Sequence, residues 1–301
     1  MDSDNLDNLT GILCPKALEN KVQSAFLECV EKFELEGKEG VHYSIVMFDV
    51  DYFKAINDLF GHEQGDVALA GLGEILRDYQ SRTEFVGVFG RYGGDEFLII
   101  LPYHLSKKAK YIADEIRTIV ENYAFLDVEK GKFSLKDYIT LSMGVGSVDI
   151  AEIYKKSISG VEKNLAVKNV TDQVKHEANL ALDYAKFLGK NRVEIFSEYL
   201  ADELKNLKIV RKFFFRNAYK DVSELKIFEQ ELFIKNKELF DKMMEYFNLL
   251  KKEINKKDVR TQSVFADNIY RFLLLNYNKD SRNEILNLFE KDTNEQSLAK
   301  D

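Results

Sequence analysis

The 301-residue sequence contains no tryptophan, two prolines, two cysteines and four histidines. The cysteines, Cys14 and Cys29, form no CxxC pair, so neither a disulfide framework nor a structural zinc site is indicated. No apolar run approaches the ~18 residues of a membrane span, and the acidic start MDSDNLDNLTG lacks the basic and apolar regions of a signal peptide. We therefore expect a cytoplasmic protein that does not engage a membrane.

Basic charge is also in short supply, because 43 Lys and Arg stand against 51 Asp and Glu, giving a formal net charge of -8. A protein that binds nucleic-acid polymers needs a basic surface for the phosphates, so we do not expect such a partner. The composition, 45% apolar and 31% charged, supports a buried core. The length accommodates two domains.

Apolar periodicity predicts an alternation of helices and strands up to about residue 198. Predicted helices follow Pro15 and cover 66–79, 103–122 and 174–190, and predicted strands cover 42–51, 84–90, 95–101, 138–148 and 191–196. The two runs on either side of RYGG predict a β-hairpin, because glycine supplies the positive φ of a tight turn. The fold class is therefore α/β, of the α+β kind, with a central mixed sheet and an antiparallel hairpin inside it.

The pattern changes to long helical stretches after residue 198, which predicts a domain at 1–198 and an all-α domain at 199–301. One double stripe of apolar residues dominates the second domain: Phe228, Leu232, Leu239, Met243, Tyr246 and Leu250, with Phe233, Phe240 and Phe247 beside it. A helical-bundle core is the favoured interpretation over a ligand groove. The basic run 251–260 is more typical of a solvated helix end than of a binding site.

Paired carboxylates mark the hairpin, where GRYGGDEFLIIL places Asp95 and Glu96 at the start of a buried strand. Another carboxylate, Asp49, ends the strand at 42–51. If the two strands are neighbours, Asp49 and Asp95 face one another and suit Mg²⁺, which prefers carboxylate and phosphate oxygens. Taken singly, Asp51 and Asp58 are more typical of solvated positions.

These motifs resemble the GGDEF family of diguanylate cyclases. The signature Gly93 to Phe97 is intact, and residues 49–66 match D-x-D-x-F-K-x-I-N-D-x-x-G-H-x-x-G-D at every specified position. DNLTGILCPKAL and ALDYAKFLGKNRV resemble two further family motifs, with small departures. The resemblance covers residues ~5–197 and implies the palm fold of nucleotidyl cyclases.

The resemblance implies that Asp49 and Asp95 ligate Mg²⁺ or Mn²⁺, helped by the Val50 carbonyl, with Glu96 near a second ion or the attacking hydroxyl. We also count Lys54 among the catalytic candidates. Such metals activate a 3′-hydroxyl of one GTP for attack on the α-phosphate of another and neutralise the developing charge.

Glycines and lysines are the candidate phosphate contacts. Gly93 and Gly94 permit close approach of the backbone, although turn formation alone also explains them. Lys186 and Lys190 are four residues apart, so they share a helical face or its end and can meet the β- and γ-phosphates. Either lysine alone is more typical of a solvated position.

Asn57 and Asp66 are the candidate base contacts. Guanine presents N1–H and N2–H donors beside the O6 acceptor, which a carboxylate and an amide complement. Adenine lacks that donor pair and leaves Asp66 unpaired, so GTP is favoured over ATP.

Two departures from the family pattern stand out. The R-x-x-D motif of the usual product-inhibition site is replaced by Glu84 and Gly87, so we expect that site to be absent. The segment 151–173 is longer than expected and has no assigned role.

Three functions are compatible with the sequence. An active diguanylate cyclase is favoured, working as a homodimer because each site holds one GTP. The alternatives are a domain that binds GTP or a partner without turnover, and a synthase with another cyclic nucleotide or oligonucleotide product. Since the cyclase begins almost at residue 1, we expect residues 199–301 to act in dimerisation, in regulation or as the docking site of a partner.

Overall fold

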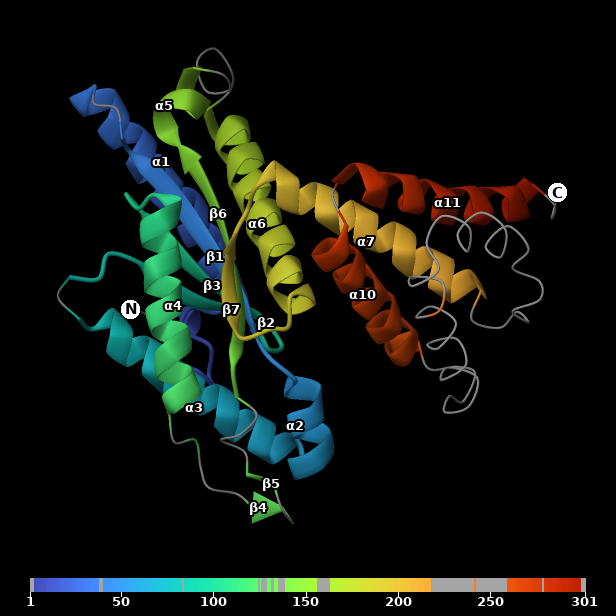
Figure 1. Ribbon diagram of the computed structural model, residues 1–301. Helices are drawn as coiled ribbons and strands as arrows, with labels where there is room; N and C mark the ends of the chain where they lie inside the picture. The colour runs from blue at the N-terminus through green and yellow to red at the C-terminus, as the bar shows by residue number, and fades with distance from the viewer. Residues whose placement is uncertain are drawn as a thin grey trace. The chain divides into compact units, whose positions relative to one another are not determined.

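A five-stranded mixed sheet forms the centre of the first part of the chain (Figure 1). The computed structural model describes residues 3–37, 40–82, 84–123, 125, 129–130, 133–134, 139–155, 163–217, 241, 259–277 and 279–298. The chain divides into two compact units, Met1–Leu200 and Ala201–Asp301.

The strands run in the spatial order β2-β3-β1-β6-β7. Their bounds are β1 (His42–Val50), β2 (Val88–Gly93), β3 (Glu96–Pro102), β6 (Leu141–Asp149) and β7 (Arg192–Ile195). Neighbours pair antiparallel except β6 and β7, which are parallel. A separate small sheet pairs β4 (Glu129–Lys130) with β5 (Phe133–Ser134). The predicted mixed sheet and hairpin are confirmed.

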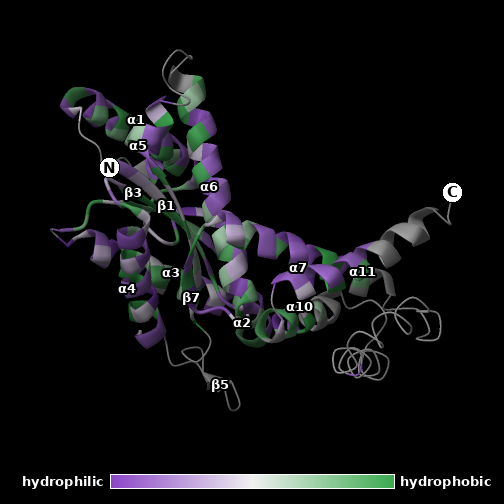
Figure 2. Cartoon of the chain, turned by 45° about the horizontal axis from the view of Figure 1, so that its top comes forward, coloured by the Kyte–Doolittle hydropathy of each residue, from purple (hydrophilic) through white to green (hydrophobic). Residues whose placement is uncertain are grey.

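Helices cover both faces of the large sheet. Their bounds in the first unit are η1 (Ser3–Asn5), α1 (Pro15–Glu36), α2 (Phe53–Phe60), α3 (His62–Gln80), α4 (Ser106–Asn122), α5 (Ile150–Ile153) and α6 (Lys163–Phe187). Helices α1 and α6 pack on one face, and α3 and α4 pack on the other. These covering helices carry both hydrophilic and hydrophobic residues, as helices with one buried side do (Figure 2).

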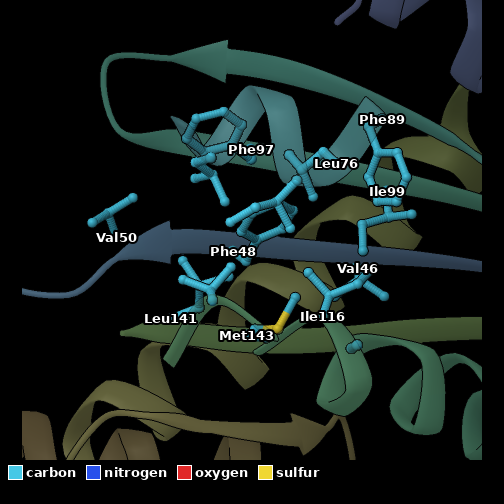
Figure 3. Close-up of a cluster of buried hydrophobic side chains, with 14 of the residues drawn as sticks. Val46, Phe48, Val50, Leu76, Phe89, Phe97, Ile99, Ile116, Leu141 and Met143 are labelled. Carbon is cyan, nitrogen blue, oxygen red and sulfur yellow. The ribbon is translucent and has the colours of Figure 1, made fainter. Parts of the chain in front are cut away.

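Strand β1 supplies both cores by alternation. Val46, Phe48 and Val50 point to the α3/α4 side, whereas Ile45 and Met47 point to the α1/α6 side. Phe48 lies in the middle of the first cluster (Figure 3) and stacks on Phe97, with ring centroids 5.3 Å apart. The same alternation places Asp49 on the α1/α6 face.

Helix α6 approaches the sheet unusually closely. A β-carbon built at Gly144 of β6 would lie 2.1 Å from both the Ala178 carbonyl oxygen and the Leu182 amide nitrogen of α6. Only a residue without a side chain permits this distance. The helix begins at Lys163, so the second part of the long segment 151–173 belongs to it, while the range 156–162 lies outside the described residues.

The second unit contains helices only, within the residues described for it. These are most of α7 (Glu198–Asn217), together with α10 (Val259–Asn276) and α11 (Lys279–Leu298). Phe213 and Phe289 are fully buried, with ring centroids 4.7 Å apart. The apolar double stripe from Phe228 to Leu250 and most of the basic run 251–260 lie outside the described residues.

Candidate active site

Asp49 and Glu96 lie directly opposite one another across the β1/β3 pair. Because cross-strand partners point to the same face, both carboxylates share the α1/α6 side of the sheet. Only 14% of the Asp49 side chain is exposed, whereas Glu96 is exposed. Strand pairing thus gathers two predicted site residues at one edge.

Asp95 lies in the hairpin turn itself. Gly93 pairs with Glu96, so Gly94 and Asp95 form a two-residue turn, with Gly94 at φ 54°. The prediction that Asp95 lies just after the turn is wrong by one position, because the strand pairing extends as far as Gly93. The Val50 amide donates to the Asp95 carbonyl oxygen at 3.3 Å.

Lys186, in the last turn of α6, donates to Asp49 Oδ2 at 2.8 Å. The close packing of α6 against the sheet brings this ammonium group to the end of β1. Lys186 keeps 31% of its side chain exposed, so it remains accessible from solvent.

The pKa of Asp49 is raised above its usual value. Burial is the largest cause, and the negative charges of Asp95 and Asp51 act in the same direction. The hydrogen bond and positive charge of Lys186 oppose the shift. A buried carboxylate among other carboxylates is a place where a cation gains electrostatic energy.

Asp51 is fully buried, so the prediction of a solvated strand end is wrong for this residue. Its carboxylate accepts from Thr140 Oγ1 at 2.7 Å, from Ser142 Oγ at 2.6 Å and from the Asn191 amide at 3.0 Å. Nothing in the local sequence pattern signals this burial, because all three donors are at least 89 residues away.

Lys190 lies in the turn after α6, with its ammonium nitrogen 3.6 Å from the centroid of the Tyr52 ring. This distance is within the range of a cation–π contact. Tyr52, Lys190 and Asn191 have φ values of 60°, 69° and 47°. Three non-glycine residues in the left-handed region, gathered in two adjoining turns, are held by their surroundings rather than by local preference.

The candidate base contacts lie on two packed helices, Asn57 on α2 and Asp66 on α3. Gly65 makes room for Asn57, because a β-carbon there would lie 2.0 Å from Asn57 Oδ1. That oxygen is buried and has no hydrogen-bond partner. Asp66 is exposed, as is Lys54 on α2, and no ion pair within the described ranges includes Lys54.

Arg91 connects the hairpin to the start of the chain, a role that the sequence motifs do not indicate. It donates to Asp7 Oδ1 at 3.2 Å and to the Gly94 carbonyl oxygen at 2.9 Å. Although burial favours the neutral acid, hydrogen bonds from Thr10 and the charge of Arg91 hold the pKa of Asp7 below its usual value. The motif at the start of the chain thus supports the turn that carries Asp95.

Residues 4–192, more than half of the chain, match the sequence family described as "Diguanylate cyclase, GGDEF domain". The chain belongs to the GGDEF diguanylate cyclase family. The resemblance inferred from the motifs is thereby confirmed.

Curated relatives of this GGDEF protein include diguanylate cyclase A of Treponema denticola, 31% identical over 186 residues that cover 62% of this chain and 44% of the relative. A diguanylate cyclase of Vibrio cholerae is 34% identical over 125 residues, covering 40% of this chain and 36% of the relative. The chain therefore spans less than half the length of these two relatives.

Solved structures similar to this GGDEF protein include the GGDEF domain of DgcB from Caulobacter crescentus in complex with c-di-GMP. It matches at a TM-score of 0.49 and 23% identity, covering 65% of this chain and 94% of that one. Diguanylate cyclase SiaD of Pseudomonas aeruginosa, in complex with its activator SiaC, matches at 0.48 and 27%, covering 64% and 62%.

Metal-ligand clusters and membrane-spanning helices are both missing from the described part of this GGDEF protein. No cluster of three or more His, Cys, Asp or Glu side chains placed to hold a metal occurs among the described residues. In the same part of the chain, no helix has both the length and the hydropathy needed to cross a bilayer.

Proposed function

We propose that this chain is an active diguanylate cyclase that condenses two GTP molecules into cyclic di-GMP and releases two pyrophosphates. One observation carries the proposal: Asp49, Asp95 and Glu96 meet at one edge of the sheet, and Lys186 reaches the same edge from α6. Carboxylates for cations and an ammonium group for phosphates are the two charge types that phosphoryl transfer requires.

Asp49 and Asp95, with the Val50 carbonyl, would hold Mg²⁺ or Mn²⁺, and Glu96 stands beside them. The residues fit such an ion, because burial and, to a smaller extent, the charge of Asp95 raise the pKa of Asp49, and a divalent cation would favour its ionised form. Mg²⁺ is usually bound by one or two carboxylates together with substrate phosphates, which is the donor set that Asp49, Asp95 and a bound GTP would provide. Bound there, the ion would supply charge neutralisation and hydroxyl activation.

The triphosphate would lie between the Gly93–Gly94 turn and the two lysines. Gly94 has open space around its α-carbon, so backbone can approach a phosphate oxygen. Lys186 would move its hydrogen bond from Asp49 to a phosphate as the nucleotide arrives. Lys190, held over Tyr52, would meet the same phosphates from the turn after α6.

Guanine would bind against α2 and α3. Asn57 offers an amide donor for O6 and has a carbonyl oxygen without a partner, and Asp66 offers carboxylate oxygens to N1–H and N2–H. A base without that donor pair would leave the Asp66 carboxylate unpaired at the base, which disfavours its binding.

Two copies of the chain would face one another during the reaction, since one site holds one GTP and the product contains two. Specific activity should therefore rise with protein concentration, in parallel with the dimer fraction that sedimentation measures. We assign dimerisation, or regulation of it, to the domain at 199–301. A chain ending at residue 198 that dimerises and turns over as well as the whole chain would contradict that assignment and favour partner docking instead.

The deciding experiment is incubation of the purified chain with GTP or with ATP and Mg²⁺, followed by mass identification of the products. We expect cyclic di-GMP from GTP, and loss of product by at least about 100-fold in Asp95→Asn, because one metal ligand loses its charge. Asp58→Asn is the matched control, since it removes an exposed carboxylate from α2 outside the site. GTP binding without product, or a product from ATP, would refute the proposal in favour of one of the two alternatives.

A further inference from the structure

Asp51 presents a problem that the proposed reaction leaves unsolved. It is a fully buried carboxylate, and burying a charge is costly unless strong hydrogen bonds compensate. Both of its oxygens are engaged: Oδ1 by Ser142, and Oδ2 by Thr140 and the Asn191 amide. With three donors already on it, the carboxylate is oriented toward the protein rather than toward a ligand.

The backbone donor among the three belongs to the turn after α6. Lys190 and Asn191 both adopt left-handed backbone conformations there, which residues other than glycine disfavour, lysine more than asparagine. A hydrogen bond from the Asn191 amide to a carboxylate is charge-assisted and therefore stronger than one to a neutral acceptor. This hydrogen bond thus helps to hold the left-handed turn.

Helix α4 holds the same turn from the other side. Asn191 Oδ1 accepts from Arg117 Nη1 at 2.8 Å, and Asn191 Nδ2 donates to Glu121 Oε1 at 2.8 Å. With Asp51 on its backbone and α4 on its side chain, Asn191 is fixed at both ends. Lys190 immediately precedes it and Lys186 lies one turn further back.

We propose that Asp51 is a positioning residue for the triphosphate: by holding the Lys190–Asn191 turn, it fixes where the ammonium groups of Lys186 and Lys190 meet the β- and γ-phosphates. This role rests on the proposed function, because it presupposes that GTP binds at this edge. What Asp51 supplies is a buried hydrogen-bond acceptor. The role requires an acceptor at this position and no direct action of the carboxylate on the substrate.

The test compares two ligands in the full chain, a non-cleavable α,β-methylene analogue of GTP and GMP, each titrated by calorimetry with Mg²⁺. Asp51→Ala should weaken the triphosphate by about tenfold or more, the scale of a lost charged contact, and leave GMP within about twofold. Asp51→Asn should stay within about threefold for both ligands, because its amide oxygen can accept from Asn191 while its NH₂ group donates to Ser142.

A second pair of variants covers the case in which Asp51→Ala does not fold. Asn191→Val keeps Asp51 and its hydroxyl donors but forces the turn out of the left-handed region, so it should reproduce the selective loss of triphosphate binding. Asn191→Gly, which tolerates that region, should lose less. Ser44→Ala is the matched control, since it removes a buried hydroxyl from β1 seven residues before Asp51.

The outcomes separate this role from the proposed function. If the unmodified chain binds neither ligand, the proposed function fails and this role fails with it. If the unmodified chain binds both, equal weakening of GMP and triphosphate in Asp51→Ala overturns the positioning role alone. So does Asp51→Asn behaving as badly as Asp51→Ala, because that result would show that the charge itself acts on a metal or on the substrate.

Discussion

The ammonium nitrogen of Lys186 lies 2.8 Å from Oδ2 of Asp49, which joins the end of α6 to the end of β1 by an ion pair. One residue proposed for the phosphates and one proposed for the metal therefore neutralise each other. Binding of the metal–nucleotide complex would separate them, with each charge passing to a new partner of opposite sign.

The ion pair predicts how Asp49 titrates. Burial raises the pKa of Asp49 above 3.8 while Lys186 lowers it, so Lys186→Met should raise it further. Because the folded pKa of Asp49 is raised, its ionised form lowers the free energy of unfolding at neutral pH. That loss of stability disappears as the pH falls through the raised pKa. Carboxyl NMR titration of the metal-free chain measures the midpoint. A lower midpoint in Lys186→Met than in the unmodified chain contradicts the assignment.

Gly65→Ala should impair guanine recognition without unfolding the protein. The added β-carbon would meet Asn57 Oδ1 at 2.0 Å and push that side chain aside, while alanine favours the helix by about 1 kcal/mol over glycine. We expect the GTP affinity to fall by about tenfold, the equivalent of one hydrogen-bonded contact. Gly71→Ala in the same helix is the control, since its β-carbon would contact the rings of Phe125, at 3.2 Å, and Tyr123, at 3.9 Å, and not Asn57. Equal affinities in both variants would argue against Asn57 as a base contact.

Asp7 should make stability depend on acid pH. Its folded pKa is held below 3.8, so its stabilising contribution is fully present above that value and is lost as the pH falls through the folded pKa. Chemical denaturation from pH 5 downward should therefore show a shallower decline for Asp7→Asn than for the unmodified chain. If the two profiles are parallel, the Asp7–Arg91 pair does not support the hairpin in solution.

Cyclic di-GMP should not inhibit through the usual family site. Glu84 stands in place of the arginine, and Gly87 has no room for an aspartate, since a β-carbon would lie 2.9 Å from the Ile100 carbonyl oxygen. Calorimetry should detect no 2:1 binding of the dinucleotide to the unmodified chain. Tight 2:1 binding that is abolished in Glu84→Ala would show that the site exists in altered form.

Arg282→Met should destabilise the second unit. Arg282 donates to the buried carboxylate of Glu203, which also accepts from Tyr270, so its removal leaves an uncompensated charge at a cost of about 3 kcal/mol. Lys205→Met breaks the exposed ion pair with Asp202 on α7, the helix that carries Glu203. This change should cost less than about 1 kcal/mol. Thermal unfolding monitored by circular dichroism compares the two. Similar shifts would indicate that Glu203 is not held as an ion.

Local sequence pattern was sufficient for the sheet, because the strands carry alternating or continuous apolar runs and the hairpin carries its own turn glycine. The same pattern predicted that Asp49 lies beside the hairpin. The burial of Asp51 could not be predicted in this way, because it depends on donors at the start of β6, just before β6 and in the turn after α6. The ion pair of Lys186 with Asp49 could not be predicted from local sequence either, since 137 residues separate the two and only the packing of α6 on β6 brings them together.

The absence of a side chain at Gly144 has a wider consequence. Because α6 rests against the backbone of β6 at that point, a methyl group there would lift the helix and carry Lys186 away from the carboxylates. Tolerance to mutation should therefore be as low at this apolar, chemically inert position as at the acids themselves. The proposed reaction would thus constrain a residue that takes no part in it, because Lys186 reaches the carboxylates only while α6 stays this close to β6.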